Sequence, residues 1–587
     1  MTHVRSTGVE KGDLFIGYDP ATVHEGSDTR RKLFLKEEHR GVHMEVVGAS
    51  GTGKTYLLEH FIRQDILAGR GVCVIDPGGD MYHRLVKFCH LHRVENRLKD
   101  RLILVDPQDE VWSLGLNYLA YQEFNPNASL TAHTALVLRG IAKVFGDEDL
   151  DETPRLSKWL SALIMVLSEA GLTLAEAQDF ITNRQFRERI LLEVRNPYLI
   201  IQWKKFGDYT ERIQSEYLDS TENRLMRFIF SDRLRRIIGQ QESRINFRKA
   251  MDNGAVILAN LAPSDQLSSD EARFIGVMLI DKLCQAARSR TDVHELKRRR
   301  MYFFIDEFHN YLCDDIAKGL KELRKFGLSF VLSTQDILPL REKHVELYSA
   351  VQSNTTIKVA FAIQPEDADL MVRSLFPNYL ADDQVKRVIE RTFFRPVLTR
   401  ETVYSRSHST ARSSGSGSGA SDIAGLSEGL VTTPSTETEI SITRASNAIT
   451  GLSSFSSSGD SQGDSEGETD FPFYLLEEDK EISSIEDYTL EEKKQKLISQ
   501  LVNQKDRHAL VKVRGLEGDA WAIYTPDLPM TQMVLKSRFE ETVRAAKARP
   551  ALLSSEVDLQ IEARRQNLLA SAEEVEPERA LPDVFGE

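Results

Sequence analysis

The segment at residues 48–55, which reads GASGTGKT, most strongly constrains what this chain can fold into. It matches the phosphate-binding loop pattern at every required position. An apolar run at 42–47 precedes it and predicts a β-strand, and the pattern at 56–62 predicts the start of a helix. In that context, backbone N–H groups turn toward phosphate oxygens at the amino end of a helix. A glycine-rich turn with an incidental lysine is the alternative. The residues expected to bind nucleotide are Gly48, Ser50, Gly51, Thr52, Gly53, Lys54 and Thr55.

A second apolar run, at 301–305, ends in the acids Asp306 and Glu307 and predicts a buried parallel strand. The carboxyl ends of such strands are where α/β sheets bind ligands. Lys54 is therefore expected to reach the β- and γ-phosphates of ATP, while Thr55 and Asp306 hold Mg²⁺. Glu307 is expected to activate the attacking water, and a carboxylate base favours ATP hydrolysis over a glutamine-dependent GTPase switch. The alternative is a strand that ends in two solvated acids.

A third predicted strand, at 328–333, is followed by Thr334 and Gln335. A glutamine at this strand end would lie beside the other two motifs. Gln335 is therefore predicted to hydrogen-bond the γ-phosphate or the attacking water, and to report the nucleotide state to the rest of the protein.

Five motifs in this order resemble those of the FtsK/HerA superfamily, and most closely those of TraG/TraD-type coupling ATPases of conjugative DNA transfer. They are GASGTGKT at 48–55, VIDPGGD at 74–80, FIDEF at 304–308, ELRKFGLS at 322–329 and STQ at 333–335. The resemblance runs from about residue 12 to 400 and resumes near 509–530.

This resemblance implies a RecA-like ring motor, expected to be a hexamer with ATP between subunits and double-stranded DNA in a central pore. It also implies relaxase or secretion-channel proteins as partners, and an arginine that one subunit supplies to the next. Arg324 is the first candidate for that arginine. The alternative for Arg324 is a charge on the surface of a helix.

The sequence departs from many coupling proteins because it has no run of about eighteen apolar residues, which a membrane-spanning helix requires. The first residues also lack the apolar core of a secretory signal. We therefore expect a cytoplasmic protein with no direct membrane insertion, whose association with a membrane would depend on a partner.

The net charge of −14 is unexpected for a DNA-binding protein, but in a ring motor only the pore must be basic. Basic clusters at 233–236 and 297–300 could supply local positive potential, and solvated helix faces are the alternative. The four cysteines are far apart, without a Cys-x-x-Cys pair, so neither a disulfide framework nor a zinc site is expected.

The predicted fold class is α/β, with a RecA-like P-loop core, a mostly parallel sheet, an inserted all-α domain and a disordered Ser/Gly-rich insertion. The predicted parts are the first part of the core at 1–130, the all-α domain at 131–252, the second part of the core at 253–403, the low-complexity insertion at 404–470, a helix and edge hairpin that complete the core at 471–532, and a charged tail at 533–587, helical to about Glu573 and then disordered.

The sequence leaves three functions open. The first is an ATP-driven DNA translocase of the coupling type, in conjugative or mobile-element transfer. The second is a HerA-type motor that acts with a separate nuclease in DNA end-processing or phage defence. The third is a nucleotide-gated scaffold, against which an intact Glu307 argues, since a scaffold needs no water-activating base.

Overall fold

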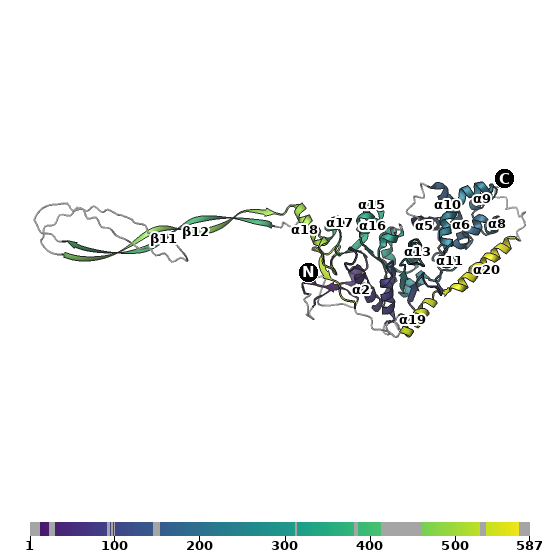
Figure 1. Ribbon diagram of the computed structural model, residues 1–587, viewed down its shortest axis with the longest axis horizontal. Helices are drawn as coiled ribbons and strands as arrows, with labels where there is room; N and C mark the ends of the chain where they lie inside the picture. The colour runs from purple at the N-terminus through teal and green to yellow at the C-terminus, as the bar shows by residue number, and fades with distance from the viewer. Residues whose placement is uncertain are drawn as a thin grey trace. The chain divides into compact units, whose positions relative to one another are not determined.

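The computed structural model describes residues 12–22, 30–90, 94, 98, 100–144, 153–311, 314–380, 385–411, 461–528 and 536–573 (Figure 1). The chain divides into two units. Unit 1 comprises Met1–Asp382 and Leu490–Glu587, and unit 2 comprises Asp383–Thr489.

Unit 1 is built on one mixed sheet whose described strands follow the order β2-β1-β14-β13-β10-β3-β9-β8-β4-β7-β5. The strands from β10 to β5 are parallel, and their bounds are β3 (His43–Val47), β4 (Gly71–Asp76), β5 (Leu102–Val105), β7 (Val256–Asn260), β8 (Met301–Ile305), β9 (Leu328–Thr334) and β10 (Thr355–Ala360). Because these strands are parallel, their carboxyl ends meet at one edge of the sheet. The predicted α/β class is confirmed.

Four antiparallel strands extend the sheet beyond β10. They are β13 (His508–Val513), β14 (Trp521–Tyr524), β1 (Leu14–Tyr18) and β2 (Lys32–Leu35). The predicted hairpin near the carboxyl end, β13 and β14, is therefore not at the edge of the sheet. The amino-terminal strand β1 pairs with β14 through Tyr18 and Tyr524, and β2 forms the edge.

The two faces of the sheet bury alternate residues of each central strand, as the period of a strand requires. In β8, Tyr302 and Phe304 pack into the same cluster as α2 (Lys54–Leu67) and α3 (Asp80–Cys89). Met301, Phe303 and Ile305 pack into the cluster on the opposite face, which contains α13 (Ser269–Arg288). Both faces of β8 are thus buried, as the continuous apolar run predicts.

The segment between β6 (Trp112–Ser113) and β7 contains no strand among its described residues, which agrees with the predicted all-α insertion. Its aromatic core brings Trp159 within 5.1 Å of Trp203 and Phe206, measured between ring centroids. Its helices are α5 (Leu130–Val144), α6 (Pro154–Glu169), α7 (Ala177–Thr182), α8 (Arg184–Leu191), α9 (Pro197–Gly207), α10 (Glu211–Ile229), α11 (Asp232–Ile238) and α12 (Phe247–Asn253).

The second half of the core contains α14 (Asp314–Glu322), the 3₁₀ turn η6 (Leu323–Phe326), α15 (Leu338–Lys343), α16 (Val345–Asn354) and α17 (Pro365–Leu375), while α1 (Glu37–Arg40) precedes β3. No helix among the described residues is long and apolar enough to cross a membrane. The cysteines Cys73, Cys89 and Cys284 are buried and free, and Cys313 lies outside the described residues.

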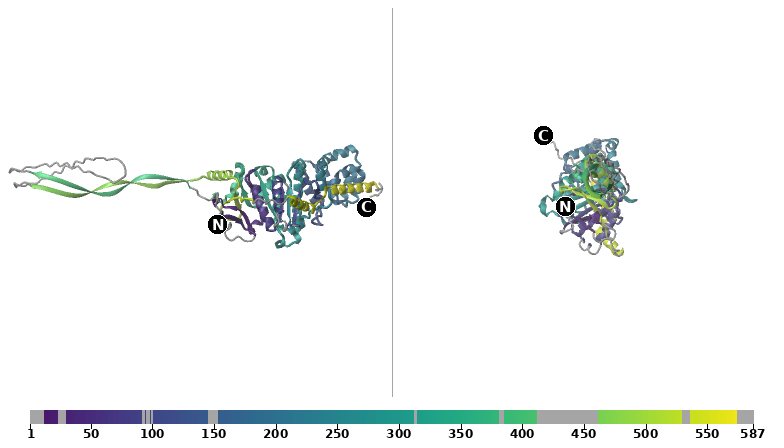
Figure 2. Two further views of the ribbon diagram at one scale, coloured as in Figure 1. Left: turned by 60° about the horizontal axis from the view of Figure 1, so that its bottom comes forward. Right: turned by 90° about the vertical axis from the view of Figure 1, so that its left-hand side faces the viewer.

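The carboxyl-terminal part of unit 1 consists of α18 (Leu490–Val502), α19 (Lys536–Ala548), β15 (Leu552–Leu553) and α20 (Ser554–Glu573). The helix α19 packs against β5, where Lys547 Nζ lies 2.8 Å from Asp106 and 2.6 Å from Asp109. The helix α20 packs against α8, and Figure 2 shows it, in yellow, along the blue helices of the all-α segment. The charged tail is therefore docked along these helices, and residues 574–587 lie outside the described part.

Unit 2 is a long antiparallel hairpin of β11 (Val385–Ala411) and β12 (Ser461–Asp487), whose strands coil around one another (Figure 1). The predicted start of the low-complexity insertion, residue 404, falls within β11, and its predicted end, residue 470, falls within β12. The bounds 404 and 470 were predicted from the low apolar content of the segment. Two strands pair through backbone groups, so pairing can extend past the point where apolar side chains become scarce. Residues 412–460 lie outside the described part of the chain.

Candidate nucleotide site

The phosphate-binding loop joins the end of β3 to the start of α2, as the sequence predicts. Gly51 and Gly53 have φ values of 81° and 112°, which a residue with a side chain rarely adopts. A Cβ atom on Gly48 would lie only 2.6 Å from the Cβ of Phe361. The N–H of Ala49 donates to the Ala362 carbonyl at 2.7 Å and fixes the loop to the end of β10. This backbone leaves the amino end of α2 open toward an anion.

Lys54 is buried and its ammonium lies on the loop itself. Nζ donates to the Gly48 carbonyl and, at 3.2 Å, to the Ala49 carbonyl. Glu307 Oε1 lies 4.0 Å from the same nitrogen. Burial lowers the pKa of Lys54, whereas the carboxylates of Glu307 and Asp306 act in the opposite direction. The lysine is thus positioned among groups that favour its charged form.

The structure brings the two predicted metal ligands together. Thr55 Oγ1 donates to Asp306 Oδ2 at 3.3 Å, across the gap between α2 and the end of β8. Asp306 Oδ1 accepts the N–H of Glu307 at 3.1 Å. Hydroxyl and carboxylate oxygens are suitable Mg²⁺ ligands. The described residues contain no group of three or more His, Cys, Asp or Glu side chains that could hold a metal ion. Thr55 and Asp306 would therefore leave most coordination positions of Mg²⁺ to water and phosphate oxygens.

Glu307 has a backbone conformation that few residues with a side chain adopt, with φ of 44°. Its Oε1 accepts a hydrogen bond from Gln335 Nε2 at 2.8 Å, and His309 Nδ1 lies 3.4 Å from its Oε2. Burial raises the pKa of Glu307 above the ordinary range of a carboxyl group, and the bond from Gln335 opposes this. Strained backbone and a raised pKa are common at catalytic carboxylates.

Arg324 is the one predicted site residue that the structure places elsewhere. It lies exposed in η6, which precedes β9, whereas Gln335 follows the opposite end of that strand. Burial and, after it, the nearby charge of Arg324 lower the pKa of His43, which lies at the amino end of β3. Within one subunit, Arg324 is therefore at the amino edge of the sheet and the phosphate-binding loop is at the carboxyl edge.

Arg507, which the motifs do not include, also contacts the phosphate-binding loop. Its N–H donates to the Thr52 carbonyl at 2.9 Å, and its φ is 66°. Its guanidinium donates to Asp527 Oδ1 at 2.6 Å and to the Thr525 carbonyl at 2.7 Å. The connection between α18 and β13 thus supports the loop from a position about 450 residues away in sequence. No local pattern could have revealed this.

The Asp76 motif forms a turn and a helix cap. Asp76 Oδ1 accepts the N–H of Gly78 at 3.0 Å, and Oδ2 accepts the N–H of Tyr82 at 2.7 Å. Burial raises the pKa of Asp76, while these N–H donors act against that rise. This motif therefore holds the first turn of α3 against the end of β4.

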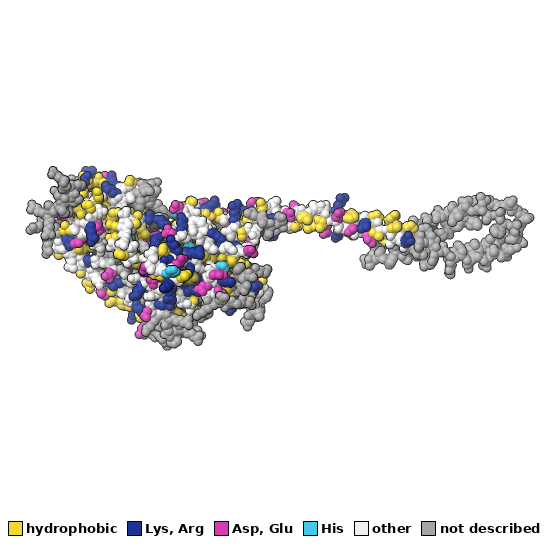
Figure 3. Space-filling model, turned by 180° about the vertical axis from the view of Figure 1, so that it is seen from behind, with side chains coloured by type: hydrophobic (Ala, Val, Ile, Leu, Met, Phe, Trp, Pro, Cys, Tyr) yellow, Lys and Arg dark blue, Asp and Glu magenta, His cyan; other side chains and the backbone are white. Residues whose placement is uncertain are grey.

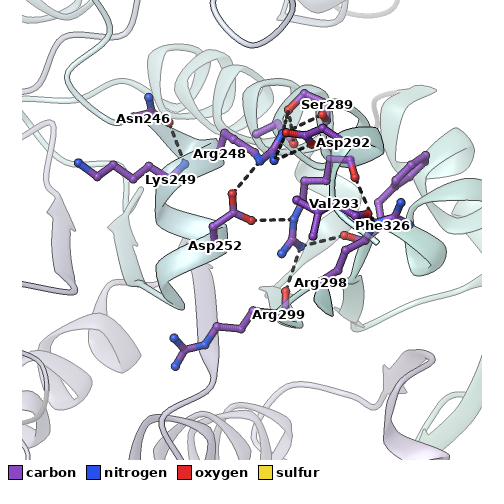
Figure 4. A network of polar contacts seen from close by, with 12 residues as sticks. Asn246, Arg248, Lys249, Asp252, Ser289, Asp292, Val293, Arg298, Arg299 and Phe326 are labelled. Atoms are coloured by element: carbon purple, nitrogen blue, oxygen red, sulfur yellow. Dashed lines mark hydrogen bonds and ion pairs between the residues drawn. The ribbon is translucent and has the colours of Figure 1, made fainter. Parts of the chain in front are cut away.

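The basic cluster at 297–300 holds loops at the amino edge of the sheet. Arg298 Nε donates to the Val293 carbonyl at 2.9 Å (Figure 4). Arg299 Nη1 donates to the Asn253 carbonyl at 2.8 Å. Asp252 nearby pairs with Arg248 at 2.8 Å and with Arg290 at 3.0 Å. The arginines of the cluster donate to backbone carbonyls, which carry no charge, so they hold these loops together and keep their own positive charge at this edge of the sheet.

The second basic cluster, at 233–236, is engaged in the same way. Arg236 forms a two-pronged pair with Asp558 of α20, at 2.7 and 2.8 Å. Arg233 Nη1 donates to the Gln108 carbonyl at 2.7 Å. Both interactions tie the all-α segment to its neighbours in unit 1.

Residues 269–392 match the family model described as the type IV secretion-system coupling protein DNA-binding domain. The matched segment contains Asp306, Glu307, Arg324 and Gln335. The resemblance to coupling proteins is confirmed. No curated protein matches the sequence.

Several solved structures align with the chain at low identity. An unbound form of the bacterial conjugative coupling protein TrwBdeltaN70 is 16% identical, with 86% of this chain and 89% of that chain covered and a TM-score of 0.47. The plasmid coupling protein TrwB in complex with ADP and Mg²⁺ is 14% identical, with 90% and 98% covered and a TM-score of 0.47. VirB4 of Thermoanaerobacter pseudethanolicus is 13% identical, with 62% and 88% covered and a TM-score of 0.40.

Proposed function

We propose that this chain is an ATP-hydrolysing ring motor that translocates DNA, as a cytoplasmic coupling-type ATPase of conjugative or mobile-element transfer. The observation that supports this most is the convergence of Lys54, Thr55, Asp306, Glu307 and Gln335 from three adjacent strand ends. The last three lie within the segment that matches the coupling-protein family model.

The residues present fit a nucleotide with a magnesium ion. The N–H groups of Gly51 and Gly53 have no hydrogen-bond acceptor in the described part of the chain, so they are available to phosphate oxygens. Thr55 and Asp306 would hold Mg²⁺, which when bound would neutralise charge on those oxygens. Lys54 would exchange the loop carbonyls that it now contacts for phosphate oxygens.

Glu307 would accept a proton from the water that attacks the γ-phosphate. The hydrogen bond from Gln335 fixes the orientation of its carboxylate, and the raised pKa makes it a stronger base than an ordinary carboxylate. Gln335 would thereby link the position of the base to β9, the strand that begins near Arg324.

The remaining parts of the proposal concern assembly and partners. A ring, expected to be a hexamer, would place Arg324 of one subunit at the nucleotide of its neighbour, and double-stranded DNA would pass through the centre. Relaxase or secretion-channel proteins are the partners that a coupling protein would serve. The family match supports DNA as a ligand of this class of domain.

The test compares two variants of the full chain with a matched control. Lys54→Ala should lose nucleotide affinity, because it removes the charge that meets the phosphates. Glu307→Gln should bind ATP and hydrolyse it about 10²–10⁴-fold more slowly, the usual contribution of a general base. The control is Glu342→Gln, which removes the charge of an exposed carboxylate on α15.

Phosphate release and the binding of a fluorescent nucleotide would be measured with and without double-stranded DNA. Displacement of a third strand from a DNA triplex would report translocation. Turnover of Glu307→Gln close to that of the control would contradict the assignment of the base. Hydrolysis without strand displacement would contradict the motor.

A further inference from the structure

The β11–β12 hairpin exposes hydrophobic side chains that unit 2 itself does not cover. The side chains of Tyr474, Leu476, Phe394 and Leu398 are 69%, 63%, 62% and 54% exposed. The described part of the hairpin carries hydrophobic and charged side chains together in Figure 3. A two-stranded ribbon is only marginally stable in water by itself. These side chains therefore indicate a surface that another chain covers.

The register shows which of these side chains act together. Pro396 lies opposite Leu476, and Leu398 lies opposite Tyr474. Residues directly opposite in an antiparallel pair point to the same side. The two pairs thus form one apolar block on one side of the hairpin. Among the described strands no third one pairs with β11 or β12, and the outer edges of the two strands carry backbone N–H and C=O groups that can accept a further strand.

The two strands differ strongly in charge. In the part of the hairpin whose side chains are described, residues 385–400 of β11 carry five Lys or Arg and one Glu. Residues 472–487 of β12 carry six Asp or Glu and one Lys. The register places Arg391 opposite Glu481 and Arg395 opposite Glu477. One outer edge of the hairpin is therefore basic and the other is acidic.

This charge pattern favours a second copy of the chain over any other occupant. The two strands nearly cancel in charge, so neither an acidic nor a basic partner would match the hairpin as a whole. A second hairpin placed edge to edge matches it strand by strand, with the acidic β12 beside the basic β11 of the next copy. The strands then alternate in direction, which continues the antiparallel pattern.

We propose that the hairpin is an assembly element, in which the outer edge of β12 in one copy pairs with the outer edge of β11 in the next. Each copy uses a different edge toward each neighbour, and a contact of this head-to-tail kind closes into a ring when its rotation permits. The apolar blocks of all copies then lie on one side of a shared sheet, where they pack against one another. The proposal is independent of the nucleotide site.

A charge-swapped full chain tests this proposal. It carries Arg391→Glu, Arg395→Glu, Glu477→Arg and Glu481→Arg. Both opposite pairs within the hairpin keep unlike charges, so the hairpin itself should still form. The swapped chain should pair with itself but poorly with the wild type, because at every mixed junction the substituted side chains would meet side chains of their own sign.

Cross-linking between hairpins provides the readout. One population carries Thr392→Cys and the other carries Lys480→Cys, both at exposed positions, in a Cys313→Ser background whose other cysteines are buried. A short bis-maleimide should join the two populations when both are wild type or both are swapped. Adducts should fall about tenfold when one is wild type and the other swapped, given two like-charged pairs at each mixed junction.

Copies that both carry Thr392→Cys serve as the control, since two β11 strands are not neighbours in this arrangement. The proposal is overturned if wild-type copies do not cross-link to one another, or if swapped copies do not. It is also overturned if wild-type and swapped copies cross-link to each other as well as each does to itself. Adducts between two β11 strands would also overturn it. ATP hydrolysis by the same samples reports separately on the nucleotide site.

Discussion

Two adjacent arginines of α20 offer a test of how the carboxyl-terminal helix is held. Arg564 Nε donates to Glu176 Oε1 at 2.8 Å, and Arg564 Nη2 donates to the Gly239 carbonyl at 2.7 Å. Arg565 donates to Asp179 at 2.7 and 3.0 Å. Both therefore bridge α20 to the all-α segment with similar distances. They differ in burial, and burial decides the outcome of removing each.

The Arg564 side chain is 15% exposed and its partner Glu176 is 2% exposed, whereas Arg565 is 46% exposed. Arg564→Ala leaves a buried carboxylate whose Oε1 has lost its cation, a change that costs roughly 3–5 kcal/mol in buried pairs. The bonds from Thr173 to Oε2 remain, so we expect about 3 kcal/mol. Arg565→Ala should cost less than about 1 kcal/mol, because water replaces an exposed partner.

Denaturant unfolding of the full chain, followed by tryptophan fluorescence, measures the difference. Trp159 and Trp203 lie in the core of the all-α segment and report on the region that Arg564 stabilises. Hydrogen exchange of the α20 amides should rise in Arg564→Ala and stay near the wild-type rate in Arg565→Ala. Equal losses of stability in the two variants would refute the argument from burial, and so would a larger loss for Arg565→Ala.

Two further predictions concern the amino edge of the sheet. Burial and the nearby charge of Arg324 lower the pKa of His43 from 6.5 to about 4, and its Nδ1 accepts the N–H of Phe330 at 3.0 Å. Below about pH 6.5 the unfolded chain takes up a proton on this histidine that the folded chain does not, so the free energy of unfolding falls as the pH drops toward 4. The variant His43→Asn keeps a hydrogen-bond acceptor and should regain up to about 3 kcal/mol of unfolding free energy at acid pH. The control, His83→Asn at an exposed position, should regain none of it. If Arg324 serves the neighbouring subunit, Arg324→Ala should bind ATP yet hydrolyse it about 10³–10⁵-fold more slowly, with Lys325→Ala near normal. Mixing Arg324→Ala with Lys54→Ala chains should restore phosphate release, and no recovery in confirmed mixed rings would exclude Arg324.

The convergence of Lys54, Thr55, Asp306, Glu307 and Gln335 could be predicted from the sequence because each belongs to a local motif at the end of a strand. Strand pairing between distant segments could not. β1 pairs with β14 across about 500 residues, which moves the predicted edge hairpin into the interior of the sheet. The buried ion pair of Glu45 in β3 with Lys358 in β10, at 2.6 Å, could not be predicted from the sequence either. The contact of Arg507 with Thr52 has the same cause.

Arg324 and the candidate nucleotide site lie at opposite edges of the sheet. The seven-residue strand β9 separates Arg324 from Gln335, a length of roughly 20 Å at the usual rise of a strand. No side chain spans that distance, so Arg324 cannot serve the nucleotide of its own subunit. Beside Glu307 lie Lys54 Nζ, 4.0 Å from Oε1, and His309 Nδ1, 3.4 Å from Oε2. Lys54 is the cation expected at the γ-phosphate, and hydrolysis of this kind develops charge that a second cation stabilises. In the proposed ring a neighbouring subunit would supply that second cation, and the mixed-chain rescue tests both the role of Arg324 and the ring.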